Sequence, residues 1–444
     1  MLDFLKFILG YIFSVWWLIL PLMVWFIVKE KHLFIKRIVY RSGLKWVFLE
    51  IKIPEHVKKT PSAMEEIFYS LHAIYRGGDP YSKYILGFTP PFYVFELIGH
   101  NGKLRFIIRC LERLKDFVSS RIYSQYPEAI IEEIDDPLDN LPWKIPNPTF
   151  NVFGTEYTFT KKEDDKITPK NYYSIKTYKV WETPILIQEE RIIDPISILS
   201  EGISYLSDKE WIVIQIMAMP VLGNDKEYGL EWVKKGEKEI DKIMGKKESQ
   251  EPSPLDYIIE FIKNLFLAFL GQKIEWKVGK KEDTKEDINI MKLTPYQREA
   301  IENIQKKISK PGYWCTIRFC YVAKNDIFSK FQDRNVSLVM STFKVFDNPV
   351  GNGIIRDTKT ITSIDKPIHG KIPYYDEKIF FRKRFIWLYT KGRFPTDFSS
   401  NRIILNTEEI ASLYHIPQEI VYPTGIEKIT YRKIPPSYEI PQLD

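Results

Sequence analysis

The chain has 444 residues, of which 27% are charged and 15% aromatic, and its formal net charge is +6. So small a charge on 52.7 kDa does not by itself indicate a nucleic-acid-binding protein. Three cysteines supply no disulfide framework and fit a reducing compartment. The length predicts two or three domains.

An uncharged stretch lies near the start of the chain. The 22 residues from Phe7 to Val28 carry no charge, and as a helix they would extend roughly 33 Å, enough to cross a hydrocarbon core. The stretch is longer than the apolar part of a secretory signal, and no small-x-small cleavage site follows it. We expect a permanent transmembrane anchor, with a buried core helix as the alternative. The anchor is defined by Phe7, Trp16, Trp17, Pro21, Trp25 and Val28.

More basic residues follow this stretch than precede it. Those that follow it are Lys29, Lys31, Lys36, Arg37 and Arg41. The positive-inside rule then predicts a single-pass protein of the cytoplasmic (inner) membrane, with the N-terminus outside and the bulk of the chain in the cytoplasm. The same five residues should contact anionic lipid headgroups.

The hydrophobic pattern of residues 44–136 predicts a first folded domain. Alternating apolar residues in 46–53 indicate a strand, and Thr60-Pro61 begins a helix. Two strands joined across 99–102, a helix near 112–126 and a strand near 129–134 follow. The order βαββαβ is that of the ferredoxin-like fold. Residues 1–43 are then the anchor and its basic juxtamembrane segment.

A second domain is predicted beyond a linker. Prolines crowd the start of residues 137–170, which we interpret as the linker. Residues 171–395 alternate helical and strand patterns, interrupted by an insertion at 245–292. The fold class is therefore α+β: an N-terminal transmembrane helix followed by two ferredoxin-like domains. A divergent duplication stays open, because no run of residues matches between the halves.

The insertion contains an apolar helix, 255–271, between charged flanks. Its uncharged run is too short to cross a bilayer. It could lie in the membrane interface, contact a partner, or pack on its own domain. Its candidate contact residues are Phe261, Leu265, Phe266 and Phe269.

Sequence motifs for catalysis are absent. The chain contains no phosphate-binding G-x-x-x-x-G-K-[ST] loop, no G-x-S-x-G elbow and no H-E-x-x-H pair. Cys315 and Cys320 lie an odd number of residues apart in a predicted strand, so they face opposite sides as core thiols rather than metal ligands. We therefore predict no enzyme, no catalytic residue, no metal and no cofactor.

One stretch combines basic and aromatic residues, 380–394. Such a mixture can neutralise phosphates and stack bases, and it also fits a plain strand with one buried aromatic face. Both interpretations can hold together. The candidate nucleic-acid residues are Arg382, Lys383, Arg384, Lys391 and Arg393.

The sequence of residues 396–444 predicts a capped helix followed by a proline-containing tail. Asn406 and Glu409 have the spacing of a capping box, and Pro417 ends the helix. With Leu413, they form a candidate interface for a partner. The polar tail suits a linker or a partner-binding arm.

Several segments, in this order, resemble one known family: WWLILPL, KWVFLEIKIP, RIYSQYPEA, LTPYQREAIENIQKKISKPGYWCTIRFCYVAK, FFRKRF and LNTEEIASLYHIP. It is the membrane-anchored, non-catalytic region associated with type IV secretion and conjugation-type DNA-transfer ATPases of small-genome bacteria. The resemblance implies a membrane-tethered scaffold whose partners are lipid, a separate phosphate-loop ATPase and further copies of itself. The alternative is a nucleic-acid-binding module at the membrane.

Overall fold

Ten strands form a single sheet in the computed structural model, which describes residues 20–21, 23–25, 27–29, 31–33, 35–54, 59–164, 168–182, 194–226, 228–229, 231–245, 293–363, 373–395, 402–417 and 428–429. The strand order is β10-β1-β3-β2-β6-β7-β5-β8, with β4 also beside β1 and β9 also beside β7. Neighbouring strands are antiparallel, except that β10 runs parallel to β1. The strands are β1 Trp46–Pro54, β2 Tyr93–His100, β3 Lys103–Leu111, β4 Ile130–Ile134, β5 Phe150–Phe159, β6 Glu210–Val221, β7 Gly312–Lys324, β8 Ile354–Arg356, β9 Ile403–Asn406 and β10 Lys428–Ile429.

The first half of the sheet follows the element order β1-α2-β2-β3-α3-β4, with α2 at Pro61–Leu71 and α3 at Lys115–Gln125. Pro61 occupies the first turn of α2, where its missing N–H costs nothing. Asn101 and Gly102, both at positive φ, make the tight turn between β2 and β3. Local sequence therefore specifies this half well.

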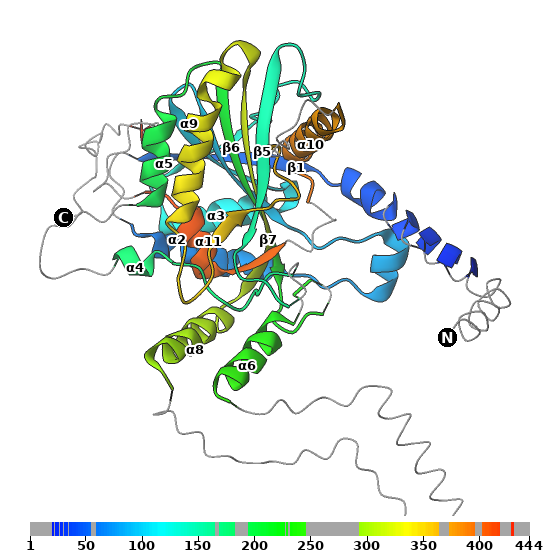
Figure 1. Ribbon diagram of the computed structural model, residues 1–444, viewed down its shortest axis with the longest axis vertical. Coiled ribbons are helices and arrows are strands. Elements are labelled where there is room, and N and C mark those ends of the chain that lie inside the picture. Colours follow the sequence, from blue (N-terminus) through cyan, green and yellow to red (C-terminus); the bar gives the residue numbers. More distant parts are fainter. Residues whose placement is uncertain are drawn as a thin grey trace, which may run out of the picture.

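The second half repeats that order as β5-α5-β6-β7-α9-β8, with α5 at Pro195–Ile203 and α9 at Asn325–Lys344. Its first strand, β5, lies within residues 137–170, so the predicted linker is partly a strand of the sheet. Helices α6 (Trp232–Ile243) and α8 (Pro295–Ile308) lie between β6 and β7 in sequence and pack together at one end of the molecule (Figure 1). Common ancestry of the halves stays a prediction.

The two halves join edge to edge. Strand β2 pairs with β6 over eight register positions, from Tyr93 opposite Ala218 to His100 opposite Trp211. Both strands are almost wholly buried, and an unpaired apolar edge would promote aggregation. The predicted arrangement of two separate domains is therefore corrected: the halves share one sheet. We call the β2–β6 junction the seam.

One face of the sheet is covered by helices α2, α3, α5, α9 and α11 (Thr407–Leu413), as Figure 1 shows. Apolar side chains of the strands and these helices form the largest hydrophobic core there, with Phe95, Ile216 and Phe319 at its centre. Cys315 belongs to this core, whereas Cys320 belongs to the core on the other face. The prediction that the two thiols point to opposite sides is confirmed.

The second face of the sheet is covered in part by helix α10 (Pro373–Gly392). Ile386 and Trp387 of α10 pack with Val213 and Cys320 of the sheet and with Leu138 of the segment between β4 and β5. Figure 1 shows α10 on the side of the sheet opposite α9. The sequence predicted a strand for this stretch; it is a helix, because dense apolar residues satisfy both periodicities.

The predicted fold is also corrected at its first element. Among the described residues, no helix has the length and apolar character needed to cross a membrane. Most of the predicted span, including Phe7, Trp16 and Trp17, lies outside the described residues. The described helical residues between 20 and 42 project from the body of the molecule, and we call them the arm (Figure 1).

A short π-helix, Ser82–Leu86, supports the arm. Gly87 follows it at φ 73°, and a Cβ atom there would lie 2.4 Å from the carbonyl carbon of Lys36. The ring of Phe88 packs against Tyr40 of the arm, with 5.6 Å between centroids. Only glycine allows the two backbones to approach so closely.

Candidate functional site on the second face of the sheet

A row of buried polar side chains crosses the seam on the second face. Glu96 of β2, Gln215 of β6, Arg318 of β7 and Glu156 of β5 occupy consecutive register positions on four neighbouring strands. Gln215 Nε2 donates to Glu96 Oε1 at 2.7 Å, and Arg318 Nη2 donates to Glu156 Oε1 at 2.7 Å. Buried charges need such partners, because burial without them is costly. We call these four residues the polar row.

The polar row also binds the C-terminal end of α10. Gln215 Nε2 donates to the Thr390 carbonyl at 2.9 Å, and Arg318 Nη1 donates to the Tyr389 carbonyl at 2.8 Å. Carbonyls in the last turn of a helix have no donor within the helix. Backbone N–H groups of Arg393 and Phe394, just beyond the helix, donate to the same two carbonyls, and the side chains of the sheet add a second donor to each, which holds the end of α10 on the sheet.

Arg393, directly after α10, completes this arrangement. Its Nε donates to Glu96 Oε1 at 2.9 Å, and its Nη1 donates to Asp136. Burial lowers the pKa of Arg393, but the nearby carboxylates of Glu96 and Asp136 outweigh burial, so its pKa is raised. The guanidinium is thus a fixed structural charge, held inside the protein.

The other candidate nucleic-acid residues are also placed by the structure. Lys391 donates to the carbonyls of Leu138 and Leu141, and Lys383 donates to Asn151. Arg382 donates to the Ile361 carbonyl at 2.9 Å. Three of the five predicted residues, Lys383, Lys391 and Arg393, therefore hold α10 on the sheet. Arg382 and Arg384 remain beside the outer side of the helix.

The outer side of α10 carries an apolar stripe. Phe381, Phe385 and Leu388 follow helical spacing and are 66%, 38% and 41% exposed. They line a surface groove of about 710 Å³ together with Lys359, Thr360, Glu377, Lys378, Arg382 and Arg384. Since the inner side of α10 is already buried, the helix is apolar on two sides. A soluble helix of this kind normally has a second packing partner.

The predicted interface residues Asn406, Glu409 and Leu413 are core residues instead. They are 2%, 0% and 3% exposed, so they offer no surface to a partner. The capping box itself is confirmed, since Asn406 Oδ1 accepts from the Glu409 N–H at 2.9 Å. Glu409 faces inward because it also pairs with Lys307, a non-local contact that the local motif does not reveal. Phe261, Leu265, Phe266 and Phe269 lie outside the described residues.

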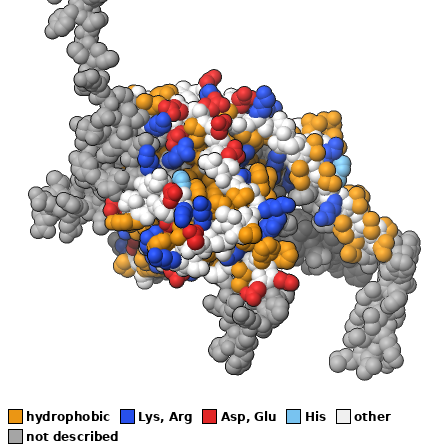
Figure 2. Space-filling view, turned by 90° about the horizontal axis from the view of Figure 1, so that it is seen from above, with side chains coloured by type: hydrophobic (Ala, Val, Ile, Leu, Met, Phe, Trp, Pro, Cys, Tyr) orange, Lys and Arg blue, Asp and Glu red, His pale blue; other side chains and the backbone are white. Residues whose placement is uncertain are grey.

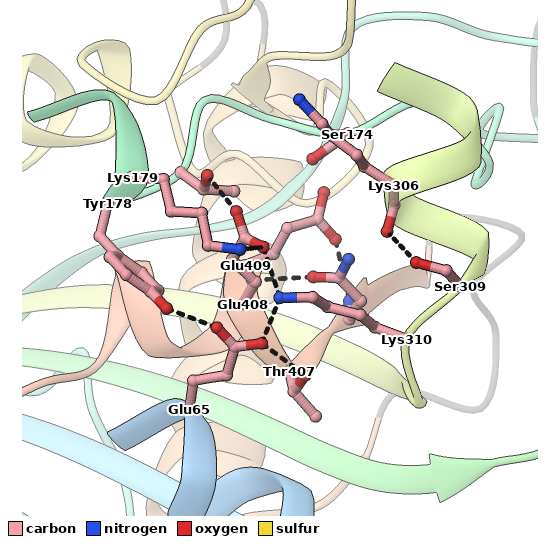
Figure 3. A network of polar contacts seen from close by, with 12 residues as sticks. Glu65, Ser174, Tyr178, Lys179, Lys306, Ser309, Lys310, Thr407, Glu408 and Glu409 are labelled. Carbon is pink, nitrogen blue, oxygen red and sulfur yellow. Dashed lines mark hydrogen bonds and ion pairs between the residues drawn. The ribbon is translucent and has the colours of Figure 1, made fainter. Parts of the chain in front are cut away.

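A network of ion pairs surrounds this motif on the helix-covered side (Figure 3). Lys310 donates to Glu408 at 2.6 Å and to Glu65 of α2, whose carboxylate also accepts from the Tyr178 hydroxyl. Lys307 and Glu409 are fully buried 3.1 Å apart. Burial lowers the pKa of Lys307, and Glu409 opposes that effect. These contacts tie α2, α8 and α11 together, which is a structural role.

The arm contains the remaining predicted residues. Pro21, Trp25 and Val28 are exposed, and Trp25 and Val28 are 61% and 58% exposed. Lys29 lies over the Trp25 ring at 5.4 Å, and Lys31 and Lys36 lie farther along the arm. Figure 2 shows hydrophobic side chains gathered along this projecting part.

Arg37 and Arg41 are half-buried, whereas Lys31 is exposed. The two arginines line a cavity of about 150 Å³ on the second face, between the arm and the sheet. Arg402, next to β9, lines the same cavity. Sequence analysis missed Arg402, because no motif marks it and only the folded chain brings it near the arm.

No protein-family model matches the chain, and no curated protein matches it. Within the described ranges, no group of three or more potential ligands is placed to hold a metal ion.

Proposed function

We propose that the chain is an assembly subunit of a type IV secretion or conjugation-like DNA-transfer system, and that it binds a separate phosphate-loop ATPase. The observation that carries the proposal is the exposed apolar stripe of α10. Phe381, Phe385 and Leu388 have the spacing with which one helix presents anchors to another. Basic residues beside the groove, including Arg384 and Lys359, favour a partner segment with acidic flanks.

The proposal places this assembly at the cytoplasmic membrane. Exposed apolar side chains on the arm and on the adjacent π-helix, among them Trp25, Val28, Ile85 and Leu86, support contact with lipid. Lys29 and Lys36 support attraction to anionic headgroups. Holding a partner near its site of action raises its effective concentration, so the subunit can act without catalysing a reaction.

Photo-crosslinking in cells tests the proposal. Phe385 is replaced by p-benzoylphenylalanine, and Tyr205, which is 67% exposed next to α5, serves as the control position. Crosslinking from position 385 to a protein that contains a phosphate loop, without the same product from position 205, is the expected result. A self-crosslink alone would instead assign the stripe to a second copy of the chain. The proposal fails if position 385 yields no ATPase adduct.

A second candidate function is binding of single-stranded nucleic acid on the same stripe. Arg384 beside exposed Phe381 and Phe385 is the observation that favours it. The internal bonds of Lys383, Lys391 and Arg393 weaken it. A DNA gel shift at about 50 mM salt that is lost in Arg384→Ala would support this candidate, and no shift at that salt would eliminate it.

A further inference from the structure

The cavity beside the seam has walls from five segments that are distant in sequence. Its floor consists of Phe92 and the β6 residues Met217 and Met219, with Trp314 of β7. Met217 lies opposite Val94 in the register of the seam, so the cavity spans the junction of the two halves. The floor is apolar, and Met217, Met219 and Trp314 belong to strands of the sheet.

Three arginines, Arg37, Arg41 and Arg402, line this cavity. Arg37 and Arg41 are four residues apart on the arm and therefore share one helical face. Arg402 approaches from the segment before β9, and its guanidinium stacks over the Trp314 ring at 4.1 Å. Stacking occupies the face of a guanidinium rather than its N–H edges. Because each group has five N–H donors, it can bond to the protein on one edge and to a ligand on another.

The charged residues among the described lining of the cavity are the three arginines. No carboxylate occurs among the described residues that line it, while Thr89 and Thr316 add hydroxyl groups. Arg109 lies nearby, stacked on Trp46 at 4.2 Å. Burial and the charge of Arg393 lower the pKa of Arg109 to about 10, so it is still charged at neutral pH. An anion would find donors and a favourable potential here.

We propose that this cavity binds a phosphoryl group, held by Arg37, Arg41 and Arg402. Arginine matches the geometry of phosphate oxygens with paired hydrogen bonds. The cavity volume of about 150 Å³ accommodates inorganic phosphate or the phosphoryl end of a lipid. Pockets for larger organic ligands usually start at about 300 Å³, so the cavity is too small to enclose a nucleotide. This inference is independent of the assembly role proposed above.

The experiment uses the full chain in detergent and follows binding by calorimetry. Three probes distinguish the sources of the phosphoryl group: inorganic phosphate, dihexanoylphosphatidic acid and dihexanoylphosphatidylcholine. Binding of both inorganic phosphate and the phosphatidic acid identifies a site for free phosphate. Binding of the phosphatidic acid alone identifies a lipid headgroup site. The choline lipid, a shielded diester, should bind at least tenfold more weakly than the phosphatidic acid.

Substitutions assign the site to its arginines. Arg37→Ala/Arg41→Ala should weaken binding at least tenfold. The control Arg113→Ala/Arg121→Ala removes the same charge from exposed residues near and on α3 and should leave affinity unchanged. Arg402→Lys keeps the charge and the contact with Trp314 but loses the paired geometry, so it should weaken binding several-fold without changing the melting temperature in the absence of ligand.

The proposal is overturned by any of three results. The wild-type chain binds neither inorganic phosphate nor the phosphatidic acid, or the cavity variants bind as well as the wild type, or the control variant loses as much affinity as the cavity variant. If the arginines only hold the arm to the body, their substitution will lower stability with no phosphate-dependent rise in melting temperature in any variant or the wild type.

Discussion

Glu96 and Gln215 face each other across the seam, and the Gln215 amide donates a hydrogen bond of 2.7 Å to the Glu96 carboxylate. Both side chains are fully buried. The pair joins the two βαββαβ halves at the point where α10 ends and where Arg393 enters the protein. The seam, α10 and the segment around Asp136 are therefore one connected structure.

Removal of the Glu96 carboxylate should cost much of the stability of the fold. Glu96→Ala leaves Gln215 and the buried charge of Arg393 without their shared acceptor, so we expect the free energy of unfolding to fall by about 3–5 kcal/mol. Urea denaturation measures it. Glu132→Ala is the control, because Glu132 lies on β4 in an exposed pair with Lys52 and should cost less than about 1 kcal/mol. Equal losses for the two variants would contradict the role of the seam.

The buried Lys307–Glu409 pair provides a second test on adjacent residues. Lys307→Met leaves the Glu409 carboxylate buried without its cation and should destabilise the protein by about 3 kcal/mol. Lys306→Met removes the neighbouring lysine, whose 2.6 Å pair with Glu302 is exposed, and should cost less than about 1 kcal/mol. The urea denaturation midpoints of the two variants, each compared with that of the wild type, measure these losses. If Lys307→Met is no more destabilising than Lys306→Met, the buried pair does not stabilise α8 and α11.

His415 should make stability depend on pH. Its Nε2 lies 3.0 Å from Asp194 Oδ1 and its Nδ1 lies 2.9 Å from the Ala411 carbonyl, so each nitrogen faces an oxygen acceptor, and only the protonated ring can donate to both. Burial lowers the pKa of His415, but the Asp194 carboxylate raises it more, to above 6.5. The folded protein then keeps a proton that the unfolded chain releases above 6.5.

The stabilising effect of this proton is complete below pH 6.5 and is lost as pH rises through the folded pKa of His415. Thermal unfolding of the wild type should therefore show a melting temperature that declines across this range. Asp194→Asn removes the charge that raises the pKa, so its decline should be shallower. Parallel profiles for the two proteins would show that the pair is not coupled to folding.

Gly87 should control the position of the arm. Gly87→Ala places a Cβ atom against the Lys36 backbone, at φ 73°, so residues 35–42 should exchange amide hydrogens at least tenfold faster. Gly245→Ala is a matched control, because Gly245 has φ 77° and nothing within 4 Å of the added atom. Mass spectrometry of exchange measures the effect. Unchanged exchange in the arm of Gly87→Ala would show that this contact does not hold the arm.

Local patterns predicted the local parts of this fold. Alternation found β1, and the Thr60-Pro61 pair found the start of α2. Local patterns failed where distant segments decide the outcome. The β2–β6 pairing joins two edges that are distant in sequence, and the burial of Glu409 depends on Lys307.

Local sequence patterns were even less able to predict the candidate sites, because distant segments of the chain form them. A basic and aromatic stretch suggested a strand with one buried aromatic face and basic residues free to bind nucleic acid, but Lys391 and Arg393 reach inward because the polar row and the 137–149 segment offer acceptors. Residues 172–181, patterned like a strand, are irregular and end in α4 (Lys179–Glu182). The convergence of Arg37 and Arg402 on one cavity has no counterpart in sequence spacing.

The assembly role is tested most directly by the amount of phosphate-loop ATPase that co-purifies with the full chain from detergent-solubilised membranes. Phe385→Asp should reduce the ATPase recovered per chain at least tenfold, because a charge at the centre of the α10 stripe opposes its burial. Tyr205→Asp, at an exposed position away from the stripe, should leave recovery unchanged. Equal recovery with both variants, or no ATPase with the wild type, would contradict the account.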